Sequence, residues 1–268
     1  MPDNWDFYLC MLEDGPASIL VDLAAAIDAP NRSLPRMAYV SVVVLHEDEN
    51  GFPGDTEFED LARLEDSLAE TATGSGCRYV GRCVNDGRID YIFYAPLVDG
   101  WDEIAASALK EFEHYEWTTG VHDEPDWATY VNFLYPDALG MLDIQNRRML
   151  LRLEKMGDNT EALRPVQHWL EFSSTEGRDA FVREAAEQGF LPEAEYCGDS
   201  DVVESVPNRH DPSLRTVGRY AVGEAKIELC LCRNDAPKAM EEVTVNLAEA
   251  ALRWGGEYIG WACAVQEE

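Results

Sequence analysis

One short segment of the sequence combines side chains that could bind a metal or activate water. His122, Asp123, Glu124 and Asp126 provide an imidazole and three carboxylates, and both groups are common ligands of divalent metals. The segment lacks the i, i+4 histidine pair that brings two ligands onto one helix face. An acidic chain also produces such strings by chance. We expect no metal here, and an enzyme with a site around His122 and Asp126 remains the alternative hypothesis.

Three other candidates for chemistry have simpler structural explanations. Cys230 and Cys232 flank Leu231, a spacing that suits neither Cys-x-x-Cys redox chemistry nor a zinc knuckle, so we expect half-buried or buried thiols. His168 shares the apolar face of an alternating strand, which favours a hydrogen-bonded core histidine over a base. The glycines of 74–76 follow a helix and precede a strand, the reverse of a phosphate-binding loop. The sequence therefore predicts no catalytic, cofactor-binding or metal-binding residue.

The charge is the main compositional feature. The 268 residues include 52 acidic and 21 basic ones, giving a net charge of −31. Residues 1–142 hold 28 acidic and seven basic residues, a net −21. Such a chain repels nucleic acid and anionic lipid and attracts basic protein surfaces. The acidity could equally serve solubility or adaptation to salt, and that alternative stays open.

Other features predict a soluble cytoplasmic protein. Its seven cysteines show no framework spacing, as is typical of reduced thiols. The longest apolar run, 38–45, is far shorter than a membrane span. Residues 1–4 show neither the positive charge nor the apolar run of an export signal. We expect a cytoplasmic location and no contact with membranes.

The first domain, residues 1–136, is predicted to be a mostly antiparallel sheet with two helices. Alternating apolar residues bounded by turn residues predict its strands, and periodic apolar residues predict helices that begin near Thr56 and Trp101. The expected strands are 5–12, 18–23, 38–45, 78–84, 88–95, 115–121 and 127–135.

The second domain, residues 160–268, follows a connecting helix at 137–159. Its pattern is strand, helix, strand, strand, helix, strand, which predicts a ferredoxin-like βαββαβ sandwich with helices on one face, and an α+β protein overall. We expect Trp254 on the apolar side of the last helix, and a long loop over 197–212. Residues 38–121 follow the same element order, which suggests two related sandwiches in tandem.

The open face of this second sheet is the candidate binding surface. Strand alternation directs Trp169 away from the helices, and Tyr258 and Gly260 are expected to share its face. Exposed aromatic residues among carboxylates suit protein recognition better than RNA stacking, which also needs basic residues. Alternatively, the N-terminal domain or the long loop covers this face.

Motifs of the second half resemble those of the regulator of RNase E activity B family. They are Asn146-Arg147-Arg148, Leu153 to Asn159, His168-Trp169, Gly189-Phe190, Cys230-Leu231-Cys232 and Gly256 to Trp261. The resemblance implies an acidic, ferredoxin-like, non-catalytic protein that binds the endoribonuclease RNase E and inhibits RNA cleavage. Ile259 departs from the pattern, because the family usually has aspartate there. We predict that the partner-binding residues are Trp169, Glu171, Glu257, Tyr258 and Gly260.

The first half resembles the bacterial family called domain of unknown function 695. The resembling residues are Trp5 to Tyr8, Pro16 to Ile19, Tyr79 to Arg82, Trp127, Tyr130 and Leu134 to Pro136. This resemblance implies a fold and no activity. The sequence as a whole predicts a regulatory protein, not an enzyme, that binds an RNase E-type endoribonuclease or another basic protein surface without contacting nucleic acid. Self-association is left open.

Overall fold

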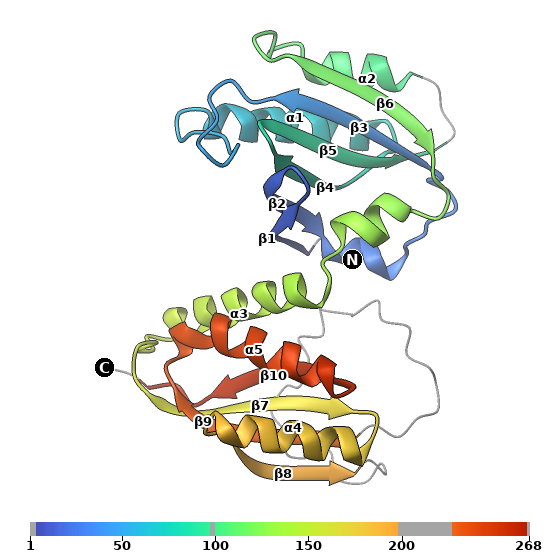
Figure 1. The fold of residues 1–268 in the computed structure, drawn as a ribbon. Helices are drawn as coiled ribbons and strands as arrows, with labels where there is room; N and C mark the ends of the chain where they lie inside the picture. The colour runs from blue at the N-terminus through green and yellow to red at the C-terminus, as the bar shows by residue number, and fades with distance from the viewer. Residues whose placement is uncertain (1–3, 97–99, 198–226, 267–268) are drawn as a thin grey trace. The chain divides into compact units, whose positions relative to one another are not determined.

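The computed structural model describes residues 4–96, 100–197 and 227–266, and its described residues form two compact units (Figure 1). The N-terminal unit ends at Asp137, and the C-terminal unit begins at Ala138. Each unit is α+β, as the sequence predicts. In the described part of the chain, no helix combines the length and apolar character that crossing a membrane requires.

The N-terminal unit is built on a six-stranded antiparallel sheet. Its strand order is β1-β2-β4-β5-β3-β6. Asp86 and Gly87 both have positive φ, +46° and +69°, between β4 and β5, which is the backbone of the tight hairpin turn predicted there. The strands are β1 (Trp5–Leu12), β2 (Gly15–Asp22), β3 (Arg36–Val43), β4 (Arg78–Asn85), β5 (Arg88–Ala95) and β6 (Trp117–Asp123).

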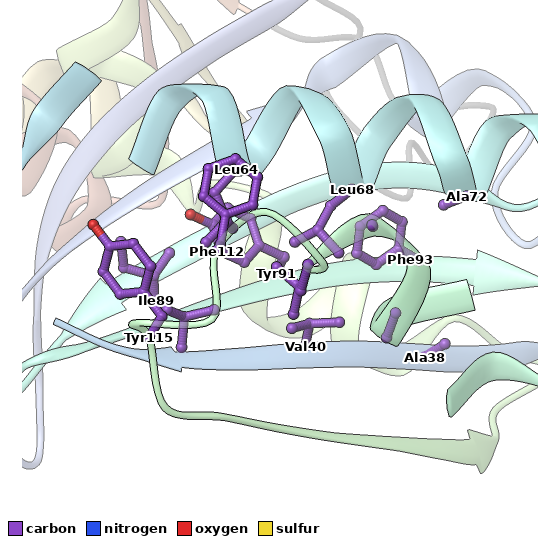
Figure 2. Packing of buried hydrophobic residues seen from close by; sticks show 14 of the residues in the cluster. Ala38, Val40, Leu64, Leu68, Ala72, Ile89, Tyr91, Phe93, Phe112 and Tyr115 are labelled. Carbon is purple, nitrogen blue, oxygen red and sulfur yellow. The ribbon is translucent and has the colours of Figure 1, made fainter. Parts of the chain in front are cut away.

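Two helices and the sheet enclose the main core of this unit. Helix α1 (Phe58–Gly74) and helix α2 (Trp101–Ala108) pack against each other and against this sheet. The apolar residues of α1 recur every three or four positions, so they form one buried face above the inward side chains of β3 and β5 (Figure 2). These helix residues are Leu61, Leu64, Leu68 and Ala72.

The segment 127–135 is the element that the sequence analysis assigned wrongly. We expected a strand, whereas the structure has a π-helical turn at Tyr130–Leu134. Trp127, Tyr130 and Leu134 are all buried, and their spacing of three and four residues is helical rather than alternating. Trp127 also has a φ of +56°, which no regular strand contains.

The C-terminal unit is a four-stranded antiparallel sheet with the strand order β10-β7-β9-β8. Helices α4 and α5 connect its strands, and the long helix α3 packs on α5. The structure describes only the first residue of the loop predicted over 197–212, because residues 198–212 lie outside the described residues. The elements are α3 (Ala138–Lys155), β7 (Arg164–Phe172), α4 (Thr175–Glu187), β8 (Leu191–Cys197), β9 (Ile227–Asp235), α5 (Met240–Arg253) and β10 (Gly256–Cys263).

The two units share one topology. In the C-terminal unit, β7-α4-β8-β9-α5-β10 is arranged with the strand order β10-β7-β9-β8. In the N-terminal unit, β3-α1-β4-β5-α2-β6 has the corresponding order β6-β3-β5-β4, and β1 and β2 extend its sheet beyond β4. This agreement supports the hypothesis of two related sandwiches, and the element order agrees with the ferredoxin-like sandwich that the sequence predicts.

Candidate functional site: the open face of the C-terminal sheet

Strand β7 separates the two faces of the C-terminal sheet. Its alternate side chains are buried beneath the helices, while Gln167 is exposed and Trp169 and Glu171 are half-buried on the opposite face. We call this opposite side, which no helix of the described residues covers, the open face. The structure therefore places Trp169 on the side that alternation predicts. The buried residues of β7 are Arg164, Val166, His168, Leu170 and Phe172.

A row of three glutamates crosses the open face. Glu257 of β10 lies opposite Glu171 of β7, and Glu171 lies opposite Glu228 of β9. All three are half-buried. The register of the three strands thus brings three acidic side chains into one row. Glu228 was not among the predicted contact residues, although its position on β9 follows from the same alternation.

Trp169 lies in the row next to these glutamates. It is opposite Gly260 of β10 and Cys230 of β9. Among the described residues, a Cβ atom at Gly260 would meet no heavy atom within 4 Å, so no described side chain fills the space beside Trp169 on this strand. The open face thus presents one large aromatic side chain next to three carboxylates, a composition suited to a basic protein segment.

The prediction that Tyr258 shares the open face is wrong, and a β-bulge is the reason. The ladder between β10 and β7 skips Ile259, so that Tyr258 lies opposite Leu170 and Trp261 opposite His168. One extra residue inverts the alternation, and both aromatic side chains therefore face the helices. Ile259, where the family resemblance led us to expect aspartate, is the residue of β10 that has no partner in this ladder.

Polar contacts beneath the sheet connect these aromatic residues to the helices. The Tyr258 hydroxyl lies 2.8 Å from Nδ1 of His168. Burial lowers the pKa of His168 to about 4, so its imidazole is neutral at physiological pH. The Trp261 indole N–H donates to Oδ1 of Asn146 on α3 (2.8 Å), and the Asn146 amide donates to the Thr244 hydroxyl on α5 (2.8 Å). His168 is a buried, hydrogen-bonded histidine, as expected.

A buried ion pair joins the end of α3 to the start of β7. The side chains of Arg164 and Asp158 are 1% and 0% exposed. The Arg164 guanidinium donates to both Asp158 carboxylate oxygens and to the carbonyls of Asn159 and Ala264. Asp158 also accepts the backbone N–H of Gln266. The pair therefore fastens the turn after α3 to the segment that follows β10.

The string at 122–126 is not assembled into a buried site. His122 is exposed on the edge strand β6, and its ring stacks on Tyr39 with 5.9 Å between ring centroids. Asp123 pairs with Arg36 at 3.0 Å, and Asp126 is exposed. Glu124 accepts hydrogen bonds from the backbone N–H and the hydroxyl of Thr129. Within 4–96, 100–197 and 227–266, no three His, Cys, Asp or Glu residues are placed to hold a metal ion.

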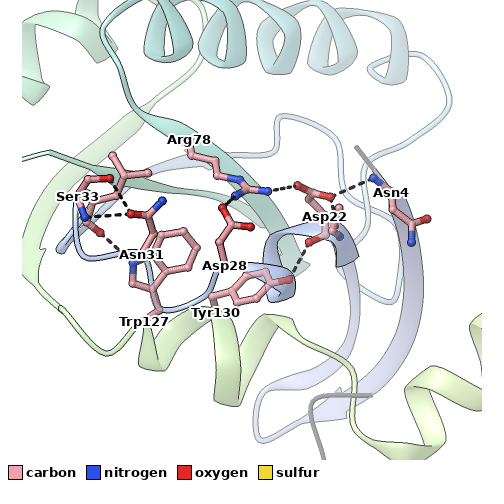
Figure 3. Close-up of polar contacts among 10 residues, drawn as sticks. Asn4, Asp22, Asp28, Asn31, Ser33, Arg78, Trp127 and Tyr130 are labelled. Carbon is pink, nitrogen blue, oxygen red and sulfur yellow. Dashed lines mark hydrogen bonds and ion pairs between the residues drawn. The ribbon is translucent and has the colours of Figure 1, made fainter. Parts of the chain in front are cut away.

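A second polar cluster in the N-terminal unit was missed by the sequence analysis (Figure 3). Arg78 bridges two carboxylates, with 3.0 Å contacts to Asp22 and to Asp28. Asp22 is buried and also accepts the backbone N–H groups of Asn4 and Ala24, while the Tyr130 hydroxyl donates to the Asp22 carbonyl. The cluster fastens the end of β2 to the start of β4 and to the segment after β6. No local spacing in the sequence brings these residues together.

Family comparisons divide the chain as the two units do. Residues 143–263 match the family described as regulator of ribonuclease activity B. After this match, we call residues 143–263 the regulator B domain. Residues 3–135 match the family of unknown function DUF695, so both families come in the order that the sequence motifs predicted.

Two further comparisons add no functional argument. A search of curated proteins gave no match. A crystal structure of an unknown protein from Galdieria sulphuraria is similar over 84% of this chain and 99% of its own length, with 12% sequence identity and a TM-score of 0.21. A likeness at that TM-score supports no inference about fold or function.

Several motif residues of the regulator B domain lie in its interior. Asn146, His168 and Trp261 are buried, the side chain of Asp158 is enclosed, and all four contact other parts of the domain. These four motif residues thus make contacts that hold the domain together. On the open face, the motif residues Trp169, Glu257 and Gly260 are half-buried and lie beside Glu171, which is outside the motifs.

Trp254 is a further aromatic residue whose position differs from the prediction. It follows the last turn of α5 and is 42% exposed. Its indole N–H donates to Glu184 of α4 at 2.7 Å. The helical periodicity that pointed Trp254 inward ends where α5 ends at Arg253, before the glycines of 255–256.

Proposed function

We propose that this chain is a non-catalytic regulator that binds an RNase E-type endoribonuclease, or another basic protein surface, in the cytoplasm and lowers or modulates RNA cleavage. The main support is the match of residues 143–263 to the regulators of ribonuclease activity B. The net charge of −31 also favours a basic partner over RNA itself.

The contact surface in this proposal is the open face of the regulator B domain. Trp169 offers an aromatic face to a cation, and Glu171, Glu228 and Glu257 offer carboxylates in one row. An arginine from the partner can stack on a tryptophan and form bidentate hydrogen bonds with a carboxylate. Of the predicted contact residues, Trp169, Glu171, Glu257 and Gly260 remain in the proposal, and Tyr258 does not.

The regulatory step follows from competition for the basic surface. Segments of a ribonuclease that bind the phosphates of RNA are rich in arginine and lysine. If such a segment occupies the open face, it is no longer available to the RNA substrate. The N-terminal unit, with most of the negative charge, would strengthen the long-range attraction and so raise the association rate.

Two tryptophan variants test this proposal. We expect Trp169→Ala to weaken partner binding by about 2 kcal/mol, which is roughly 30-fold in Kd. Trp254→Ala is the matched control, because it removes another partly exposed tryptophan of the same domain from a different surface. Binding to RNase E is measured by calorimetry, and melting temperatures are compared. Equal affinities of the two variants would contradict the role of the open face.

A further inference from the structure

Strand β6 forms one edge of the N-terminal sheet, where β3 is its neighbour among the described strands (Figure 1). The Val43 N–H donates to the Glu116 carbonyl (2.9 Å) at one end of this ladder. At the other end, the Glu124 N–H donates to the Pro35 carbonyl (2.9 Å). Both bonds show that the even-numbered residues of β6 direct their backbone groups toward β3. The odd-numbered residues therefore direct their N–H and C=O groups to the outer edge.

The outward backbone groups in the middle of β6 are available for a further strand. In the part of the chain that the structure describes, no hydrogen bond involves the backbone N–H or C=O of Thr119 or Val121. Proteins normally protect such an edge with a lysine, a proline or a bulge. Strand β6 contains neither lysine nor proline, and its register with β3 is uninterrupted. An extended segment can pair with an edge of this kind through its backbone.

The side chains of β6 give the two faces of this edge different characters. A Cβ atom at Gly120 would lie 2.7 Å from Cε1 of Tyr39, so the Tyr39 ring covers this glycine, and the His122 ring stacks on the same tyrosine. On the other face, Trp117 is half-buried and Val121 is 37% exposed. An added strand therefore meets aromatic rings on one face, which suit a cation, and apolar side chains on the other, which suit β-branched residues.

The charge around β6 selects the kind of segment that fits. Residues 101–126 include eight acidic residues and one lysine. Asp102 and Glu103 on α2 and Glu116 just before β6 are exposed, so they attract a positively charged segment. Two copies of a chain with a net charge of −31 repel each other, which disfavours the pairing of β6 with β6 of a second copy. The charge thus favours a basic strand from a different protein.

We propose that β6 binds an extended basic segment of a partner protein, which adds a strand to the N-terminal sheet. The segment alternates lysine or arginine with β-branched residues and contains no proline. Its backbone bonds to Thr119 and Val121, and its basic side chains lie beside Tyr39 and His122. This site goes beyond the proposed ribonuclease contact, which uses the open face of the other unit. Trp169→Ala should therefore leave binding at β6 unchanged, and either proposal can fail without the other.

Backbone hydrogen exchange of the full chain, followed by nuclear magnetic resonance, tests the proposal directly. In the free chain, the N–H groups of Thr119 and Val121 should exchange fast, whereas that of Gly120 is bonded to β3 and should exchange slowly. The probe is a capped peptide as long as β6 (seven residues), in which lysine alternates with valine. At about 1 mM peptide and a Kd of about 100 µM, exchange at Thr119 and Val121 should slow about tenfold. Salt should reduce this effect.

Matched controls separate strand addition from simple charge attraction. The same peptide N-methylated at every residue keeps its charge but donates no backbone hydrogen bond, so it should not slow the exchange at Thr119. Val121→Pro removes an outward N–H without breaking the ladder with β3, and Val121→Lys places a lysine on the edge. Each should abolish most of the slowing at Thr119. Val131→Lys is the control for the added charge, because Val131 is also 37% exposed but lies outside β6.

Four results would overturn the proposal. The first is exchange at Thr119 and Val121 that stays fast at every peptide concentration. The second is equal slowing by the plain and the N-methylated peptide. The third is slow exchange at these two residues in a free chain that self-associates, because a second copy would then occupy the edge. The fourth is a Val121→Lys variant that is folded by circular dichroism and binds the peptide as well as Val131→Lys does, and this variant decides alone if Val121→Pro does not fold.

Discussion

The buried pair of Asp158 and Arg164 gives the sharpest prediction about stability. In Asp158→Asn the shape of the side chain is kept, but the guanidinium loses the carboxylate that it contacts, in a site where both side chains are at most 1% exposed. Breaking a buried ion pair on one side costs about 3–5 kcal/mol. A typical domain has a free energy of unfolding of about 5–15 kcal/mol. We therefore expect the C-terminal unit of the variant to unfold at much lower urea concentration.

The matched control is a neighbouring pair of the same kind at the surface. Glu161 contacts Lys238 at 2.6 Å, but their side chains are 71% and 55% exposed, so Glu161→Gln should change the stability little. Urea titrations of the full-length variants, followed by tryptophan fluorescence and circular dichroism, measure both effects. If Asp158→Asn is no less stable than Glu161→Gln, the reasoning about the buried pair is refuted.

The pair also predicts how stability depends on pH. The hydrogen bonds from Arg164 hold the pKa of Asp158 below its usual value, so the carboxylate is charged in the fold at a pH where the unfolded chain is already protonated. The contribution of the ionised Asp158 to the free energy of unfolding is fully present above the unfolded pKa of about 3.9, and it is lost as the pH falls below that value toward the lower pKa of the folded state. The stability difference between wild type and Asp158→Asn should therefore shrink in acid, which urea titrations near pH 3 and pH 7 would show.

Three further predictions follow from the same structure. Tyr258→Phe removes the hydroxyl beside buried His168 and should cost about 1–3 kcal/mol in urea unfolding; an unchanged midpoint would show that this contact is dispensable. A gel shift with labelled single-stranded RNA at low salt should show no binding, because the chain has four lysines and a net charge of −31; micromolar binding would contradict the account. Residues 137–268 should fold alone, as circular dichroism would show. Measured by surface plasmon resonance, this fragment should bind the ribonuclease with a slower association rate and a weaker salt dependence than the full chain, but with nearly the same dissociation rate. A folded fragment that does not bind would assign recognition to the N-terminal unit.

Much of the fold was predictable because the local signals and the tertiary contacts agree. The alternation of β7 separates buried His168 from Trp169 on the open face, and the apolar period of α1 matches its buried face. The turn residues Asp86 and Gly87 gave the hairpin of β4 and β5. In each case one short segment contains all the information that its conformation requires.

The features that could not be predicted depend on contacts between distant segments. The bulge at Ile259 is defined by the pairing of β10 with β7, and it turns Tyr258 toward the helices against the local alternation. The cluster of Arg78 with Asp22 and Asp28 joins residues about fifty positions apart. The row of glutamates on the open face likewise requires the register of three strands, which no single strand determines.

Inhibition of RNA cleavage is the measurement that tests the central claim most directly. RNase E is assayed on a labelled RNA with increasing amounts of the full chain, over a series of salt concentrations. The account predicts inhibition that weakens as salt rises, with Trp169→Ala a much poorer inhibitor than Trp254→Ala. Cleavage that is unaffected by the full chain at every salt concentration would contradict the assignment of this protein as a regulator of an RNase E-type endoribonuclease.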